Sequence, residues 1–179
     1  FITSNGSGNA AVLFTYMAII NIGILVISFK KYWKPLYYVS FVITWLIVLV
    51  WYDTTYQSGD LGAALVSISV FFALFYLTFL AYKLFHKEEF AIQDITLLIV
   101  NSFIFYGIGY SVLDDHLTAD RYLGLFTLIN ALVHAIVGVV IYRRGLNDKN
   151  IFSLIVGLAL VFLTIAIPVQ LDGNWVTLL

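Results

Sequence analysis

One apolar segment of this sequence, residues 122–142, carries an asparagine and a histidine on a single helical face. Thr127, Asn130, His134 and Gly138 are separated by three, four and four residues, and this spacing aligns side chains along one stripe of a helix. An imidazole exchanges a proton near neutral pH, and an amide both donates and accepts hydrogen bonds. The stripe therefore predicts either a proton or substrate site inside the segment, or a hydrogen bond between packed helices.

Two further asparagines, Asn21 and Asn101, lie near the middle of two other apolar segments. An amide left unpaired in an apolar environment costs several kcal/mol, so we expect these side chains to face other helices and not lipid. Asn101 and Asn21 are the expected partners of Asn130 and His134. These four residues form the predicted binding site.

Carboxylates that follow the apolar segments offer a second kind of chemistry. Asp114 and Asp115 directly precede His116, and Asp53 and Asp172 follow two other apolar segments. If the chain brought these groups together, they could act as general acids and bases; the alternative is a set of solvated turns. The pattern specifies no catalytic residue, metal or cofactor. Because the chain has no cysteine, thiolate ligands, thiol nucleophiles and disulfides are excluded.

The composition is that of an integral membrane protein. The 179 residues are 62% hydrophobic and only 11% charged, whereas soluble domains are about 45–50% apolar and about 25% charged. The net charge of −1 provides no electrostatic surface for nucleic acid. The expected partner of most of the surface is therefore the lipid bilayer.

Six apolar stretches approach the length that a helix needs to cross a bilayer, which is about 20 residues. None alternates between apolar and polar residues as the strands of a membrane β-barrel do. We therefore predict an all-α, polytopic transmembrane helical bundle that forms one transmembrane region over residues 1–179. The predicted spans are Ala10–Phe29, Leu36–Tyr52, Gly62–Tyr82, Ile95–Leu113, Tyr122–Tyr142 and Ile151–Val169.

The basic residues predict how the chain crosses the membrane. Eight of the nine follow the first, third or fifth span, and these are Lys30, Lys31, Lys34, Lys83, Lys87, Arg143, Arg144 and Lys149. Loops rich in lysine and arginine remain in the cytoplasm. Both ends of the sequence are therefore expected on the outer side of the membrane.

The spacing of the basic turns suggests an internal repeat. They begin at Lys30, Lys83 and Arg143, at intervals of 53 and 60 residues, and each joins two predicted helices. A nearly constant period is typical of a repeated unit, which here would give three parallel helical hairpins. The alternative is that any chain of evenly spaced spans has this pattern.

Glycines inside the spans are expected to mark places where helices approach closely, because a small residue lets two backbones come together. They are Gly23, Gly107, Gly109, Gly138 and Gly157.

Two stretches carry a resemblance to a known family. The first is Thr3-Ser4-Asn5-Gly6-Ser7-Gly8-Asn9 with the helix that follows, up to Lys31-x-Trp33-x-Pro35-Leu36. The second is Ala166-Ile167-Pro168-x-Gln170-Leu171-Asp172-Gly173-x-Trp175. Over the whole chain, the sequence resembles the bacterial predicted-membrane-protein family catalogued as domain of unknown function 2339, and its aromatic content resembles members from Bacteroidetes.

The resemblance implies a fragment of a longer protein of the bacterial inner membrane. The remaining transmembrane segments of that protein would be partners, and a seventh helix would begin near Trp175. The resemblance implies no particular activity and no catalytic residues.

Three functions stay open at this point. The first is a transport or binding role at the polar stripe. The second is a membrane enzyme that acts on a lipid-linked or envelope substrate through the outer carboxylates. The third is a structural scaffold.

Overall fold

The computed structural model describes residues 10–31, 34–86, 92–116, 122–143 and 149–170. Within these residues the chain forms α-helices and one short 3-10 helix, and no strand. The helices are α1 (Ala10–Lys31), α2 (Lys34–Thr54), η1 (Ser58–Asp60), α3 (Leu61–His86), α4 (Ile92–Asp114), α5 (Leu123–Arg143) and α6 (Lys149–Gln170). Each of the six α-helices is long and apolar enough to cross a membrane, which confirms the predicted fold class.

The observed helices match the predicted spans closely. Every predicted span except one lies inside the corresponding helix. The exception is Tyr122–Tyr142, which begins one residue before α5. Pro35 is the second residue of α2, where the missing N–H of proline would have no helical partner in any case. Pro168 lies inside α6, which continues two residues further to Gln170. The seventh helix predicted near Trp175 lies outside the described residues.

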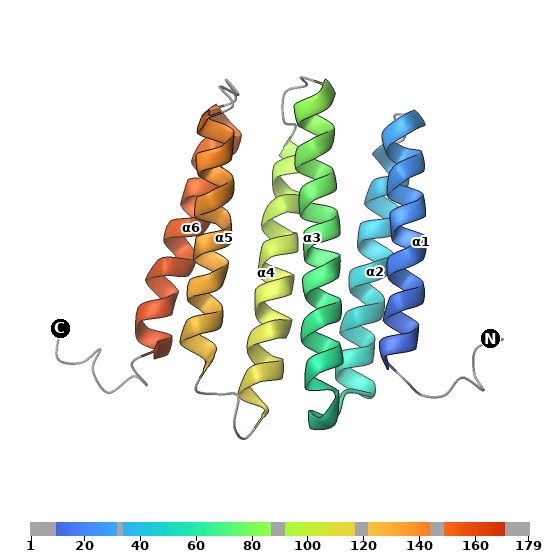
Figure 1. Cartoon of the computed structure of the whole chain (residues 1–179), viewed down its shortest axis with the longest axis vertical. Coiled ribbons are helices and arrows are strands. Elements are labelled where there is room, and N and C mark those ends of the chain that lie inside the picture. The colour runs from blue at the N-terminus through green and yellow to red at the C-terminus, as the bar shows by residue number, and fades with distance from the viewer. Residues whose placement is uncertain (1–9, 32–33, 87–91, 117–121, 144–148, 171–179) are drawn as a thin grey trace. The chain divides into compact units, whose positions relative to one another are not determined.

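The chain divides into two compact units, Phe1–Tyr82 and Lys83–Leu179. Unit 1 contains α1, α2 and most of α3, and unit 2 contains α4, α5 and α6. Within each unit consecutive helices run in opposite directions (Figure 1). The three parallel hairpins expected from the basic turns stay a prediction.

Aromatic rings fill the core of unit 1. Phe14 of α1 contacts Trp51 of α2 and Phe71 of α3, with ring centroids 4.8 and 6.0 Å apart. Phe75 of α3 packs edge-on against Phe41 of α2, with centroids 5.2 Å apart. Edge-to-face packing is favourable for aromatic pairs. These contacts hold the three helices of unit 1 together.

The core of unit 2 is built around Phe162 of α6, which is fully buried. Phe162 packs with Ala131 of α5 and Leu158 of its own helix. Tyr106 of α4 reaches the same ring, with centroids 5.0 Å apart, and stacks on Phe126 of α5. All three helices of unit 2 therefore meet at one aromatic cluster.

The six helices expose apolar side chains and bury polar ones. Many Val, Ile and Leu residues on the outer faces are exposed, for example Ile19 and Val66 at 64%. Several polar side chains within the same helices are buried, among them Asn21, Asn101, Asn130 and His134. A bilayer offers hydrocarbon to the outer face and no partner for a polar group, so this distribution is the one expected of membrane-spanning helices.

Candidate functional site

Unit 1 contains a buried hydrogen-bonded cluster between α1 and α2. The side-chain amide of Asn21 donates to Thr44 Oγ1 at 2.8 Å, and the Ser40 hydroxyl donates to Asn21 Oδ1 at 2.7 Å. Ser40 and Thr44 are four residues apart and therefore lie on one face of α2. All three side chains are buried. The amide of Asn21 thus joins two helices through both its nitrogen and its oxygen.

The hydrogen-bond partners that the structure gives Asn21 are Ser40 and Thr44 of its own unit. The predicted contact of Asn21 with Asn130 and His134 of the fifth span stays a prediction. Serine and threonine in helices often bond a carbonyl of their own helix, so their presence in the second span was a weak signal. Their position four residues apart, opposite an asparagine at the same depth, is the pattern that could have identified them.

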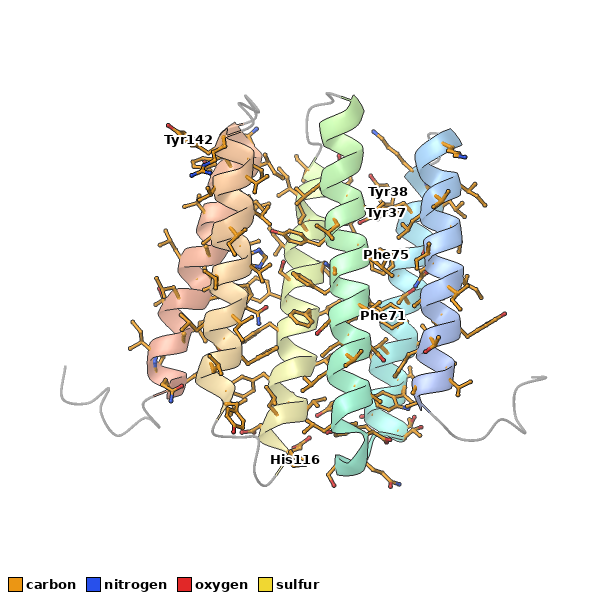
Figure 2. All side chains as sticks on the ribbon, viewed as in Figure 1. Tyr37, Tyr38, Phe71, Phe75, His116 and Tyr142 are labelled. Carbon is orange, nitrogen blue, oxygen red and sulfur yellow. The ribbon has the colours of Figure 1, made fainter. Side chains whose placement is uncertain are left out.

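Tyr37 adds a second polar link in unit 1. Its hydroxyl donates to the backbone carbonyl of Phe75 at 3.0 Å, and the two rings are 5.9 Å apart (Figure 2). That carbonyl belongs to α3, so Tyr37 ties α2 to α3. The bond provides a partner for a phenol that would otherwise be buried without one.

The predicted stripe of α5 is buried in unit 2. Thr127, Asn130 and His134 are exposed by no more than 2%, and Gly138 on the same face is buried as well. This confirms that Asn130 and His134 face protein and not lipid. The stripe therefore forms the inner surface of α5.

Local hydrogen bonds organise the first half of this stripe. Thr127 Oγ1 donates to the carbonyl of Leu123 at 2.8 Å and lies 3.2 Å from the hydroxyl of Tyr106. The side-chain amide of Asn130 donates to the carbonyl of Phe126 at 3.0 Å. The amide nitrogen of Asn130 thus bonds the backbone of its own helix.

His134 is packed against an aromatic ring. Its side chain is fully buried, and the imidazole stacks on Phe162 of α6 with a centroid distance of 5.4 Å and an interplanar angle of 10°. Within the described residues, the Nε2 atom is enclosed and makes no hydrogen bond to the protein. An imidazole held in this way has a defined orientation in the centre of α5.

Asn101 of α4 is also buried, at 2% exposure, next to the buried Ser102. Ser102 Oγ donates to the carbonyl of Leu98 at 2.9 Å. Asn101 is therefore buried, as Asn21, Asn130 and His134 are. Its pairing with Asn130 or His134 stays a prediction.

The described members of the predicted carboxylate group lie at helix ends. Asp53 is exposed near the end of α2, and Asp114 and Asp115 are exposed at the end of α4. His116 is half-buried just beyond α4 (Figure 2). Asp172, the remaining member of the predicted group, lies outside the described residues. The described parts of the chain contain no group of three or more histidine, aspartate or glutamate residues placed to hold a metal ion.

Comparison with known proteins identifies the family. No curated protein and no solved structure matches the chain. The model of one family, described as "Predicted membrane protein (DUF2339)", matches residues 1–179. Since the match extends over the full sequence, the chain belongs to this family of membrane proteins of unknown function.

Proposed function

We propose that this membrane protein has a transport or binding role, and that the polar stripe of α5 carries it, with His134 as the group that exchanges a proton. The observation that supports the proposal is an ionisable side chain enclosed in the middle of a membrane-spanning helix. Such residues are rare inside membranes, because the bilayer offers no compensation for their polarity, and they commonly mark ion or solute pathways.

The neighbours of His134 extend the polar path along one helix. Asn130 is one turn away, and Thr127 with the Tyr106 hydroxyl lies a further turn away. Thr127 and His134 are separated by about 10 Å along the axis, given a rise of about 1.5 Å per residue. A proton that enters beside Tyr106 would find hydroxyl and amide groups on the way to the imidazole. Because the ring of Phe162 stacks on the imidazole, we expect the passage of a proton to need a movement of α6 relative to α5.

The test uses the purified protein in liposomes that contain the pH-sensitive dye pyranine. A potassium diffusion potential set by valinomycin would drive protons across the membrane. We expect the pH inside the liposomes to change faster with the protein than in protein-free liposomes. His134→Phe should abolish this flux, since phenylalanine keeps a ring that stacks on Phe162 but cannot carry a proton.

His116→Ala is the matched control, because it removes a histidine from the end of α4 and leaves the stripe intact. It should conduct like the unmodified protein. The proposal is wrong if the unmodified protein conducts no faster than empty liposomes, or if His134→Phe conducts normally. Melting temperatures measured in detergent separate a loss of function from a loss of folding.

The cluster of Asn21, Ser40 and Thr44 favours a structural scaffold as the second candidate. Its hydrogen bonds join α1 to α2, as polar residues commonly do in membrane helix bundles. A scaffold predicts that His134→Ala lowers the melting temperature and that no variant changes solute flux. In the first candidate function His134 therefore controls proton flux, and in the second it controls the stability of the fold.

A further inference from the structure

A large apolar groove lies between α5 and α6. Its volume is about 740 Å³, and apolar side chains from both helices line it. Ala131 and Gly138 are buried and form its floor, whereas Leu132 and Leu160 are more than half exposed and form its rim. Small residues leave the space between the helices, and large ones flank it. The groove has the size of many small-molecule sites, which range from about 300 to 1,000 Å³.

Basic residues follow one end of the groove along the chain. Tyr142 of α5 and Phe152 of α6 line this end, and their ring centroids are 6.0 Å apart. Arg143 follows Tyr142 directly and is exposed in the last turn of α5. Lys149 is the first residue of α6, one turn before Phe152. Both helices therefore carry a cationic residue where the apolar groove ends (Figure 2 marks this end at Tyr142).

We propose that this groove binds an anionic phospholipid of the leaflet that surrounds the basic helix ends. One acyl chain lies along the alanine and glycine floor, and the phosphate lies near Arg143 and Lys149. Tyr142 has an apolar ring and a polar hydroxyl, and this combination suits the headgroup level of a bilayer. Basic pockets between transmembrane helices are typical sites for anionic headgroups.

Charge complementarity distinguishes this occupant from a packed helix. A neighbouring helix would fill the apolar groove without using the cations at its end, whereas a phospholipid satisfies both features with one molecule. The groove is formed within unit 2 by α5 and α6 alone, so the site is complete in a single chain.

The first test is native mass spectrometry of the detergent-purified protein, titrated with phosphatidylglycerol or phosphatidylcholine of identical acyl chains. The unmodified protein should bind phosphatidylglycerol more tightly. Arg143→Gln and Lys149→Gln should each reduce this preference about fivefold, because a basic residue near an anionic membrane surface contributes about 1 kcal/mol. Lys30→Gln, which removes an exposed charge from the end of α1, is the matched control and should leave the preference unchanged.

The second test blocks the apolar part of the site. Ala135 and Ala159 line the groove, so Ala135→Phe combined with Ala159→Phe should reduce the binding of both lipids. Ile136→Phe adds a ring to an exposed position of α5 that does not line the groove, and it should have no effect. Because both substituted alanines are at least partly exposed, the variant should keep its helix content by circular dichroism.

Three results would overturn the proposal. The first is equal affinity of the unmodified protein for the two lipids. The second is unchanged lipid binding by a folded Ala135→Phe/Ala159→Phe variant. The third is a dimer in the mass spectrum of the unmodified protein that is absent from the spectrum of this variant. The last would assign the groove to a second copy of the chain.

Discussion

Asn21 and His134 show two ways in which a polar side chain is accommodated inside an apolar helix bundle. Asn21 has its amide nitrogen and oxygen bonded by hydroxyls of α2. His134 is enclosed by ring packing against Phe162. In the first arrangement both polar atoms of the amide are hydrogen-bonded within the protein, as is typical of a structural contact. The second leaves the imidazole in a defined orientation, which is why the proposed function places the exchanging group there.

The bond between Asn21 and Thr44 should contribute measurably to stability. Hydrogen bonds between membrane helices contribute about 0.6 kcal/mol on average and up to about 1.7 kcal/mol. In a double-mutant cycle, Asn21→Ala and Thr44→Val should therefore show a coupling energy in this range, measured by unfolding in dodecyl sulfate.

The same cycle with Thr54→Val supplies the control. Thr54 lies at the exposed end of α2, and its hydroxyl donates to the carbonyl of Val50 in the same helix. The changes in unfolding free energy caused by Thr54→Val and by Asn21→Ala should therefore add, with no coupling energy. Additivity in the Thr44 cycle as well would show that the bond between Asn21 and Thr44 contributes nothing to folding.

The sequence predicted the burial of the candidate residues, but it did not identify the neighbours that the structure shows for them. Asn21, Asn130 and His134 are all buried, as their position in apolar segments required. Which hydroxyl or ring each one meets depends on the rotation of the neighbouring helix. That rotation is set by the packing of large aromatic side chains such as Phe162. It cannot be predicted from the periodic pattern of a single helix.

At the scale of a helix, the glycines of α4 show how an identical residue type serves different purposes. A Cβ added to Gly109 would clash with the ring of Phe126, whereas a Cβ added to Gly107 would meet no described atom within 4 Å. Phe126 is itself stacked on Tyr106 and packed beside Phe105, so its ring has little freedom to move. Gly109 is thus a point of close approach between α4 and α5, as the sequence predicted, and Gly107 is not.

Gly109→Ala should therefore destabilise unit 2 by about 1–3 kcal/mol, which is the usual cost of adding volume to a packed core. Gly107→Ala, two residues away on the same helix, should be neutral or stabilising by up to about 1 kcal/mol, since alanine favours a helix more than glycine does. Thermal unfolding of the two variants in detergent would compare them directly. Equal melting temperatures would contradict the close approach at Gly109.

Helix positions were predictable because a bilayer imposes a length. A span must hold about 20 apolar residues, and charged or turn-forming residues delimit each stretch. The helices exceed most of the predicted spans by a few residues at their ends, as at α3, which continues to His86. Amphipathic ends such as Tyr82 and Lys83 continue a helix into the headgroup region, where hydropathy alone no longer marks the boundary.

At the scale of the whole molecule, the apolar exterior of the helices and the basic ends together determine how the chain sits in a membrane. The apolar exterior requires a bilayer but is the same at both ends of a helix. The basic residues break this symmetry. Within unit 1, the end of α1 and the start of α2 carry Lys30, Lys31 and Lys34, and the opposite end of α2 carries Asp53.

We propose that the basic ends face the cytoplasm, because lysine and arginine next to membrane spans are retained on that side. The chain has no cysteine, so single-cysteine variants report on one position each. In intact spheroplasts, a membrane-impermeant maleimide should label Asp53→Cys and Asp114→Cys and leave Lys30→Cys and Arg143→Cys unlabelled. All four positions are exposed, so permeabilised cells should show labelling of every variant, which controls for reactivity. Labelling of Lys30→Cys in intact spheroplasts, with Asp53→Cys silent, would reverse the orientation. It would then place the proposed lipid site in the outer leaflet of that membrane.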